Sequence, residues 1–178
     1  IYTIISRMMA SPLEEGSIAA LDFGYMVMQT PLSTFSLAIS TAIFPFIAGY
    51  AATKSYNELV GTMSKGIRMT ALIYIPIALI FMVLCEPIIR LLFERGNFDA
   101  HARMMTSRSL FFYSIGMLGL AVNFILIRVF YALNDAVTPM LVTAVGVVGY
   151  IILNVILIKY LAHAGIALSA SIIHIGTN

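Results

Sequence analysis

The segment FGYMVMQTPLSTFSLAISTAIFPFIAGYAAT, residues 23–53, contains 31 residues without a charged side chain. Three further charge-free runs follow it, at residues 69–85, 109–127 and 136–158. A helix needs about 20 apolar residues to cross the hydrocarbon core of a bilayer, and here Lys, Arg, Asp and Glu gather between runs of that length. The pattern predicts a polytopic helical membrane protein.

The composition agrees with this prediction, because 61% of the residues are hydrophobic and only 10% are charged. In lipid every backbone N–H and C=O group must be paired within the protein, and continuous apolar runs without alternation indicate helices rather than a barrel. The expected fold class is therefore all-α, a polytopic transmembrane helix bundle. The net charge of +2 includes no block of like charge, so we expect no nucleic-acid partner.

The apolar runs predict four full spans and two partial ones, within a single transmembrane domain over residues 1–178. The full spans are expected at about 18–50, 69–92, 103–133 and 139–159, and the partial spans at 1–11 and 165–178. Both ends fall within apolar stretches, so we expect an interior fragment of a larger transporter. Numbers of Lys and Arg in the loops are nearly equal on the two sides and do not choose an orientation.

The first full span is too long for a straight crossing of the membrane. Residues 18–50 would form a helix of roughly 50 Å, against a hydrocarbon core of ~30 Å. We expect a helix kink at Pro31, which lacks a backbone donor and crowds the preceding turn. After this span, residues 54–68 are mixed and polar, and they predict a surface loop containing a short amphipathic helix.

One face of this span carries polar side chains in register. At 100° per residue they fall within an arc of roughly 60°, with Tyr25 and Met26 at its flanks. The residues of this polar stripe are Asp22, Gln29, Ser33, Ser36 and Ser40. Two interpretations stay open: serines allow helices to pack closely, or the face lines a hydrated cavity. An ionisable Asp22 favours the cavity.

Arg7 is a second candidate for the substrate cavity, because it lies in the first partial span. A cationic group there would attract an anionic head group, although a snorkelling arginine near the interface fits the sequence equally well. Thr143, Tyr150 and Asn154 form a weaker polar stripe in the fifth span. The histidines and carboxylates show no metal-ligand spacing and no Gly-rich phosphate loop is present, so we expect neither a metal nor another cofactor.

Four segments together point to a family. They are ASPLEEGSIAALDFGYMVMQTP at 10–31, AISTAIFPFIA at 38–48, LLFERGNFDA at 91–100 and FYALNDAVTP at 130–139. In order and spacing they resemble the MurJ (MviN) lipid II flippase family of the multidrug/oligosaccharidyl-lipid/polysaccharide exporter superfamily. The loop motifs rest on Arg95 and Gly96 in the third segment, and on Asp135 and Pro139 in the fourth.

The resemblance implies that the chain supplies about the seventh to twelfth helices of a protein with about fourteen. It implies a multi-pass protein of the bacterial cytoplasmic (inner) membrane, with residues 54–68 cytoplasmic and the loop around Arg95 extracytoplasmic. The implied activity is alternating-access transport, without catalysis, of undecaprenyl-pyrophosphate-linked disaccharide pentapeptide for peptidoglycan and cell-wall biosynthesis. The partners would be this anionic lipid-linked substrate and membrane lipid, and the sequence identifies no coupling ion.

The sequence departs from the family at Met26, where an arginine is common. A polysaccharide or multidrug exporter of the same superfamily is therefore the alternative function. A membrane-embedded polyprenyl-lipid transferase is a further alternative from a different class. It would need interfacial carboxylates, for which only Glu94 and Asp99 are candidates.

Overall fold

The computed structural model describes residues 2–94 and 98–178, and within these ranges all regular structure is helical. The elements are α1 (Tyr2–Ala10), α2 (Ser17–Pro31), the π-helical turn η1 (Leu32–Ser36), α3 (Leu37–Ala52), α4 (Tyr56–Val83), α5 (Cys85–Phe93), α6 (Ala100–Ile115), α7 (Met117–Ala132), α8 (Val137–Leu161) and α9 (His163–Gly176). The predicted all-α class is confirmed.

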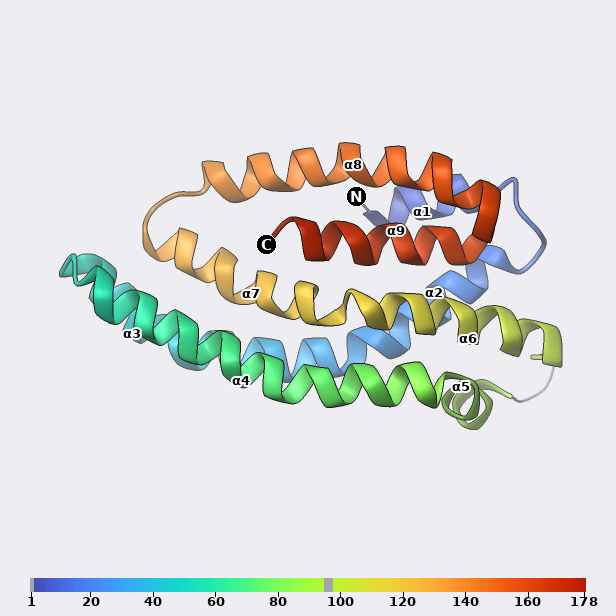
Figure 1. The fold of residues 1–178 in the computed structure, drawn as a ribbon, viewed down its shortest axis with the longest axis horizontal. Helices are drawn as coiled ribbons and strands as arrows, with labels where there is room; N and C mark the ends of the chain where they lie inside the picture. The colour runs from blue at the N-terminus through green and yellow to red at the C-terminus, as the bar shows by residue number, and fades with distance from the viewer. Residues whose placement is uncertain (1, 95–97) are drawn as a thin grey trace.

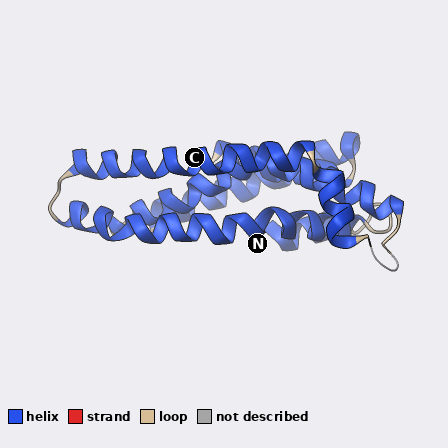
Figure 2. Cartoon of the chain, turned by 90° about the horizontal axis from the view of Figure 1, so that it is seen from below, coloured by secondary structure: helices blue, strands red, loops and turns tan. Residues whose placement is uncertain are grey.

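The helices other than α5 run lengthwise, and α5 is seen nearly end-on (Figure 1). α6 and α7 lie between the pair α8 and α9 and the pair α3 and α4, and Figure 2 shows the same lengthwise packing from below. Within residues 2–94 and 98–178, three helices are long and apolar enough to cross a membrane, at Ser17–Ala52, Tyr56–Val83 and Val137–Leu161, and α6 with α7 adds a fourth if this bent pair is one span.

The first long helix changes its hydrogen-bonding pattern directly after Pro31. Leu32–Ser36 form one π-helical turn, which contains an extra residue relative to an α-helical turn. The Tyr74 hydroxyl, from α4, donates to the Pro31 carbonyl at 3.0 Å and lies 2.6 Å from the Ser36 hydroxyl. A side chain distant in sequence therefore satisfies the backbone at this turn, and the kink at Pro31 itself stays a prediction.

The polar segment 54–68 is not a separate surface loop, and this prediction was wrong. Only residues 53–55 lie between α3 and α4, and α4 then continues without a break to Val83. Lys54 lies in the turn before α4, whereas Glu58, Lys65 and Arg68 lie within the first four turns of this long helix. α4 continues without a break through its glycines and Pro76. The polar residues of this segment therefore mark the beginning of a long helix and not a separate loop.

The expected span 69–92 also has different bounds in the structure. α4 ends at Val83, and the next helix begins at Cys85 in a different direction. Leu84 between them has φ −106° and ψ 21°, outside the helical range. Arg103 of α6 holds α5 in place, contacting Glu86 at 3.3 Å and Glu94, just beyond α5, at 2.8 Å.

The expected span 103–133 is divided at Gly116, where α6 and α7 meet at an angle of 48°. A Cβ atom at Gly116 would lie only 2.7 Å from the Ser171 Cβ on α9. The Gly116 N–H bonds to the Tyr113 carbonyl at 3.2 Å, an i→i−3 pattern that tightens the end of α6. The bend therefore occurs where glycine allows two backbones to approach.

Three more glycines pack against the same helix α9. A Cβ at Gly119 would lie 2.5 Å from the His174 carbonyl oxygen, and one at Gly149 would lie 3.0 Å from the Ile173 Cδ1. A Cβ at Gly146 would lie 3.2 Å from the Thr177 Cγ2, just beyond the end of α9. These contacts are the small-residue packing typical of membrane helices.

The fourth sequence segment begins α8. Asp135 Oδ1 accepts the N–H groups of Val137 and Thr138 at 3.0 Å, and Oδ2 accepts the Thr138 hydroxyl at 2.6 Å. The Thr138 hydroxyl, followed by the backbone donors, lowers the pKa of Asp135. Pro139 lies in the first turn, where a backbone N–H has no helical partner. Arg95 and Gly96 of the third segment lie outside the described residues.

Candidate functional site

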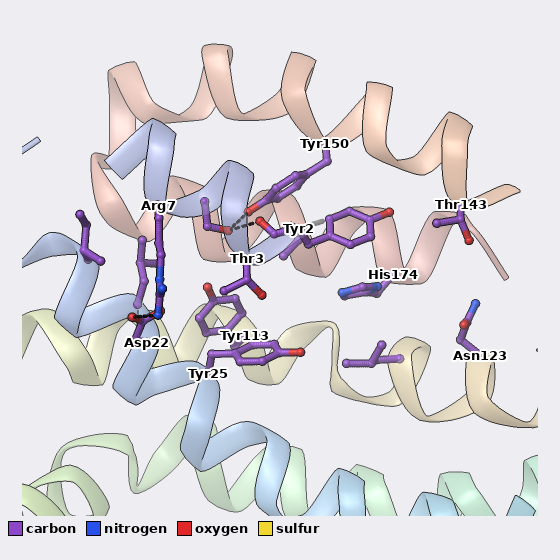
Figure 3. Close-up of a pocket in the computed structure, with 15 residues that line it drawn as sticks. Tyr2, Thr3, Arg7, Asp22, Tyr25, Tyr113, Asn123, Thr143, Tyr150 and His174 are labelled. Atoms are coloured by element: carbon purple, nitrogen blue, oxygen red, sulfur yellow. Dashed lines mark hydrogen bonds and ion pairs between the residues drawn. The ribbon is translucent and has the colours of Figure 1, made fainter. Parts of the chain in front are cut away.

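A cavity of about 250 Å³ lies within the bundle, among α1, α2 and α6 to α9 (Figure 3). Residues from all six helices line it, and they are mostly polar or aromatic. They are Tyr2, Thr3, Ser6, Arg7, Ile18, Leu21, Asp22, Tyr25, Tyr113, Leu120, Asn123, Thr143, Tyr150, Ala170 and His174. We call this space the tyrosine cavity.

Arg7 and Asp22 form an ion pair at the edge of the tyrosine cavity. A guanidinium nitrogen of Arg7 donates to Asp22 Oδ2 at 2.8 Å, and Figure 3 shows the two side chains pointing toward one another. The Arg7 side chain is 59% exposed and that of Asp22 37%. Ion pairs with such exposure contribute about 0–1 kcal/mol to stability, so this pair is weak enough to exchange partners.

Hydroxyl groups and aromatic rings form the remaining wall of the tyrosine cavity. The Ser6 hydroxyl donates to the Tyr2 carbonyl at 2.9 Å and lies 2.7 Å from the Tyr150 hydroxyl. The rings of Tyr2 and Tyr150 are 5.1 Å apart, and those of Tyr25 and Tyr113 are 5.6 Å apart, both edge to face. These pairs fix ring positions from α1, α2, α6 and α8.

A more open space, of about 680 Å³, adjoins the tyrosine cavity on α1 and α2. Its lining residues are Thr3, Arg7, Ala19, Asp22, Phe23, Tyr25, Met26, Gln29, Thr30 and Ser33. We call it the polar groove. Arg7 and Asp22 line both spaces, so the ion pair stands where the groove meets the cavity.

The predicted polar stripe is divided between two environments. Asp22, Gln29 and Ser33 line the polar groove together with the flanking Tyr25 and Met26. Ser36 and Ser40 do not line the polar groove.

Both serines are buried: Ser36 bonds to Tyr74, and the Ser40 hydroxyl donates to the Leu37 carbonyl at 3.1 Å. The π-helical turn adds one residue, which rotates all later positions by roughly 100° relative to a uniform helix. The cavity interpretation therefore fits the first half of the stripe, and the packing interpretation fits the second.

An apolar space of about 720 Å³ lies on another side of α2. It is bounded by α2, η1, α4 and α5, through residues that include Val27, Phe35, Ile80, Phe81 and Leu92. We call it the apolar groove. Met26 and Thr30 line both the polar and the apolar groove. Met26, 57% exposed, thus marks the boundary between a polar and an apolar surface.

Several lining residues of the tyrosine cavity could not be selected from the sequence. Thr143 and Tyr150 belong to the predicted stripe of the fifth span, whereas Asn154 of that stripe is fully buried and outside the lining. Tyr2 and Tyr113 belong to no periodic polar pattern or motif in the sequence, so nothing there marks them as lining residues. His174 lacks metal-ligand spacing in the sequence, and no other pattern singles it out. Its neighbours in the cavity come from α1, α7 and α8, which only the fold brings together.

The two loop carboxylates that a transferase would need have structural partners. Glu94 contacts Arg103 at 2.8 Å and Arg90 at 3.0 Å. Asp99 Oδ1 accepts the Ala102 N–H at 2.8 Å and caps α6. Among residues 2–94 and 98–178, no group of three or more His, Cys, Asp and Glu is placed to hold a metal ion. These two residues lend the transferase alternative no support.

The chain matches known proteins along nearly its whole length. A family model described as "Lipid II flippase MurJ" matches residues 1–177. A "Probable lipid II flippase MurJ" from Vibrio cholerae serotype O1 is 32% identical over 171 residues, covering 96% of this chain and 33% of the relative. A "Lipid II flippase MurJ" from Burkholderia cenocepacia is 31% identical over 170 residues, covering 95% and 33%.

A solved structure described as "Lipid II flippase MurJ, inward closed conformation" shares the fold, with a TM-score of 0.85 at 24% identity. The alignment covers 99% of this chain and 38% of that structure. The chain thus spans about a third of the length of the relatives it matches. Since the family model extends over residues 1–177, the chain belongs to the MurJ lipid II flippase family.

Proposed function

We propose that the chain is part of a flippase that moves lipid II across the bacterial cytoplasmic membrane for peptidoglycan synthesis. The family and the names of its relatives support this substrate. The helices of membrane-spanning length support a site within the bilayer. The substrate would be an undecaprenyl-pyrophosphate-linked glycopeptide, whose pyrophosphate is anionic and whose polyprenyl chain is apolar.

The observation that carries the proposal is the position of Arg7. Its guanidinium lies at the junction of the polar groove and the tyrosine cavity, and among the described residues one weak, half-exposed ion pair holds it. A pyrophosphate bears more charge than one carboxylate and offers oxygens in the geometry that guanidinium groups bind bidentately. An arriving head group would therefore displace Asp22 from Arg7 and take its place.

The apolar groove supports an amphiphilic ligand. It adjoins the polar groove along Met26 and Thr30, so one molecule could place its phosphate beside Arg7 and part of its polyprenyl chain against Phe81 and Ile80. Because this chain is already surrounded by hydrocarbon in the bilayer, the groove would hold it through close packing rather than by removing it from water. An exposed methionine at the boundary suits contact with a flexible chain.

The proposed mechanism is alternating access without covalent chemistry. Substrate binding would favour one of two conformations by the difference between its affinities for them. Interrupted transmembrane helices often surround the sites of transporters. The helix Ser17–Ala52, with η1 at its centre, is the described element best suited to bend, because its backbone departs there from the α-helical pattern.

A polysaccharide or multidrug exporter is the second candidate, and one observation favours it. Met26 lies where the family commonly has an arginine, and Asp22 neutralises Arg7, so the described part of the groove carries little net charge. An exporter of a less anionic solute would need no further positive charge in the groove. The same experiment distinguishes the two candidates.

The experiment is complementation of a bacterial strain depleted of its own flippase, using the full-length gene. We expect the wild-type gene and Arg68→Gln, an exposed change on α4, to restore growth. Arg7→Gln should restore it poorly at equal membrane abundance. No rescue by well-expressed wild-type protein would contradict the flippase assignment and favour the exporter.

A further inference from the structure

We propose that the tyrosine cavity is a binding subsite for one sugar ring of a glycosylated pyrophosphate lipid. This inference rests on the proposed function and extends it. It assigns the cavity to the glycan of the substrate and leaves the pyrophosphate to Arg7.

The size of the cavity favours a group of this kind. Its volume of about 250 Å³ would hold roughly eight water molecules at ~30 Å³ each. It is smaller than the ~300–1,000 Å³ typical of sites for drug-sized ligands. The space fits one sugar ring and excludes a whole disaccharide pentapeptide.

The lining has the chemistry of carbohydrate recognition. The hydroxyls of Tyr2, Tyr25 and Tyr113 reach the cavity wall without a hydrogen bond to any residue that the structure describes. Because these hydroxyls open onto the cavity, the molecule in the cavity, water or ligand, can be their hydrogen-bond partner. The aromatic ring pairs add apolar surfaces on which the C–H faces of a sugar can pack.

The position of the charges orients the ligand. Arg7 and Asp22 stand together at the boundary with the polar groove, while the rest of the lining carries hydroxyl, amide, imidazole and apolar groups and no Asp, Glu, Lys or Arg. A ligand with a pyrophosphate at Arg7 would therefore direct its first sugar into the cavity. Its charged part would stay in the open groove, where water can reach it.

The test uses full-length protein in lipid nanodiscs and two probes, undecaprenyl pyrophosphate and the same lipid carrying one N-acetylhexosamine. Wild-type protein should bind the glycosylated probe at least fivefold more tightly. Tyr113→Phe should weaken the glycosylated probe roughly fivefold, the effect of one lost hydrogen bond, and leave the bare lipid unchanged. Tyr160→Phe, on the 81% exposed Tyr160, is the matched control.

Equal affinity of the wild type for both probes would overturn the inference. Equal loss of both probes in Tyr113→Phe would do the same, because a structural role would not discriminate between them. Tyr25→Phe carries the test if the buried Tyr113 variant does not fold. Arg7→Gln separates this inference from the proposed phosphate site, because it should lower the affinity for both probes. Unchanged affinity in Arg7→Gln would contradict the phosphate site, whereas the comparison of the two probes in the wild type would still test the sugar subsite.

Discussion

Arg7 on α1 and Asp22 on α2 are joined by one contact of 2.8 Å, at the point where an open groove meets an enclosed cavity. The site therefore contains a cation with its own anion. Asp22 occupies the place that a substrate phosphate would take, so it should act as an internal competitor. The affinity of the protein for an anionic lipid would then reflect the exchange of one anion for another.

Removal of the Asp22 charge tests this competition. We expect Asp22→Asn to bind undecaprenyl pyrophosphate more tightly than the wild type, and Arg7→Gln to bind it more weakly. Both changes should alter the free energy of unfolding by no more than about 1 kcal/mol. Titration in nanodiscs measures the affinity, with Glu15→Gln in the exposed turn before α2 as the control. Weaker binding by Asp22→Asn would show that the carboxylate assists the ligand.

The hydroxyl of Tyr74 should stabilise the π-helical turn. Tyr74→Phe would leave the Pro31 carbonyl and the Ser36 hydroxyl without this partner in a buried place. We expect a loss of about 1–3 kcal/mol in the free energy of unfolding. Denaturant titration in detergent measures it, and Tyr56→Phe on an exposed position of α4 is the control. An unchanged stability would mean that the turn persists without the hydroxyl.

The contact between Gly116 and α9 can be tested with a single methyl group. Gly116→Ala would place a Cβ against Ser171, and overpacking of this kind costs about 1–3 kcal/mol. Gly49→Ala on α3 meets no atom within 4 Å, so it should stabilise the helix by about 0.5–1 kcal/mol. Thermal unfolding should move in opposite directions for the two variants. A shift in the same direction would contradict the packing described here.

The cap formed by Asp135 should depend on pH. Since its pKa is lowered in the folded protein, the cap contributes stability above the unfolded pKa of Asp135 and loses it as pH falls through the folded pKa. Asp135→Asn should remove this part of the acid dependence. Thr138→Val should move it to higher pH, because the largest cause of the lowered pKa is lost. Unfolding measured at several acidic pH values checks both, and curves parallel to the wild type would contradict the assignment.

The fold class followed from the sequence because the solvent imposes it. Charge-free runs of spanning length can only be helices in lipid, and these runs contain long parts of α3, α4, α7 and α8. Helix ends were less predictable. Polar residues in 54–68 suggested a loop, although water at the membrane surface allows a helix to continue through them.

Helical periodicity could select only some residues of the candidate site, for a physical reason. Asp22 and Gln29 share one helical phase within α2, and Ser33, near the start of η1, lines the polar groove with them. Beyond Pro31 the phase changes at the π-helical turn, where the Pro31 carbonyl accepts a hydrogen bond from Tyr74, more than 40 positions away. No local pattern contains this contact. Tyr113 and His174 enter the site through the packing of α6 and α9, and that packing depends on glycine contacts between helices.

The close contacts of α9 with glycines of its neighbours limit how these helices can move. The backbone of α9 lies where a Cβ atom on Gly116 or Gly119 would be. Because the contact involves backbone, a change of side-chain rotamer cannot make room for these helices to slide past one another. Gly165 of α9 makes the same kind of contact with α8, because a Cβ there would lie 2.5 Å from the Leu157 carbonyl oxygen. We expect α7, α8 and α9 to shift as one stiff body, leaving Leu32–Ser36 as the compliant joint of the described chain.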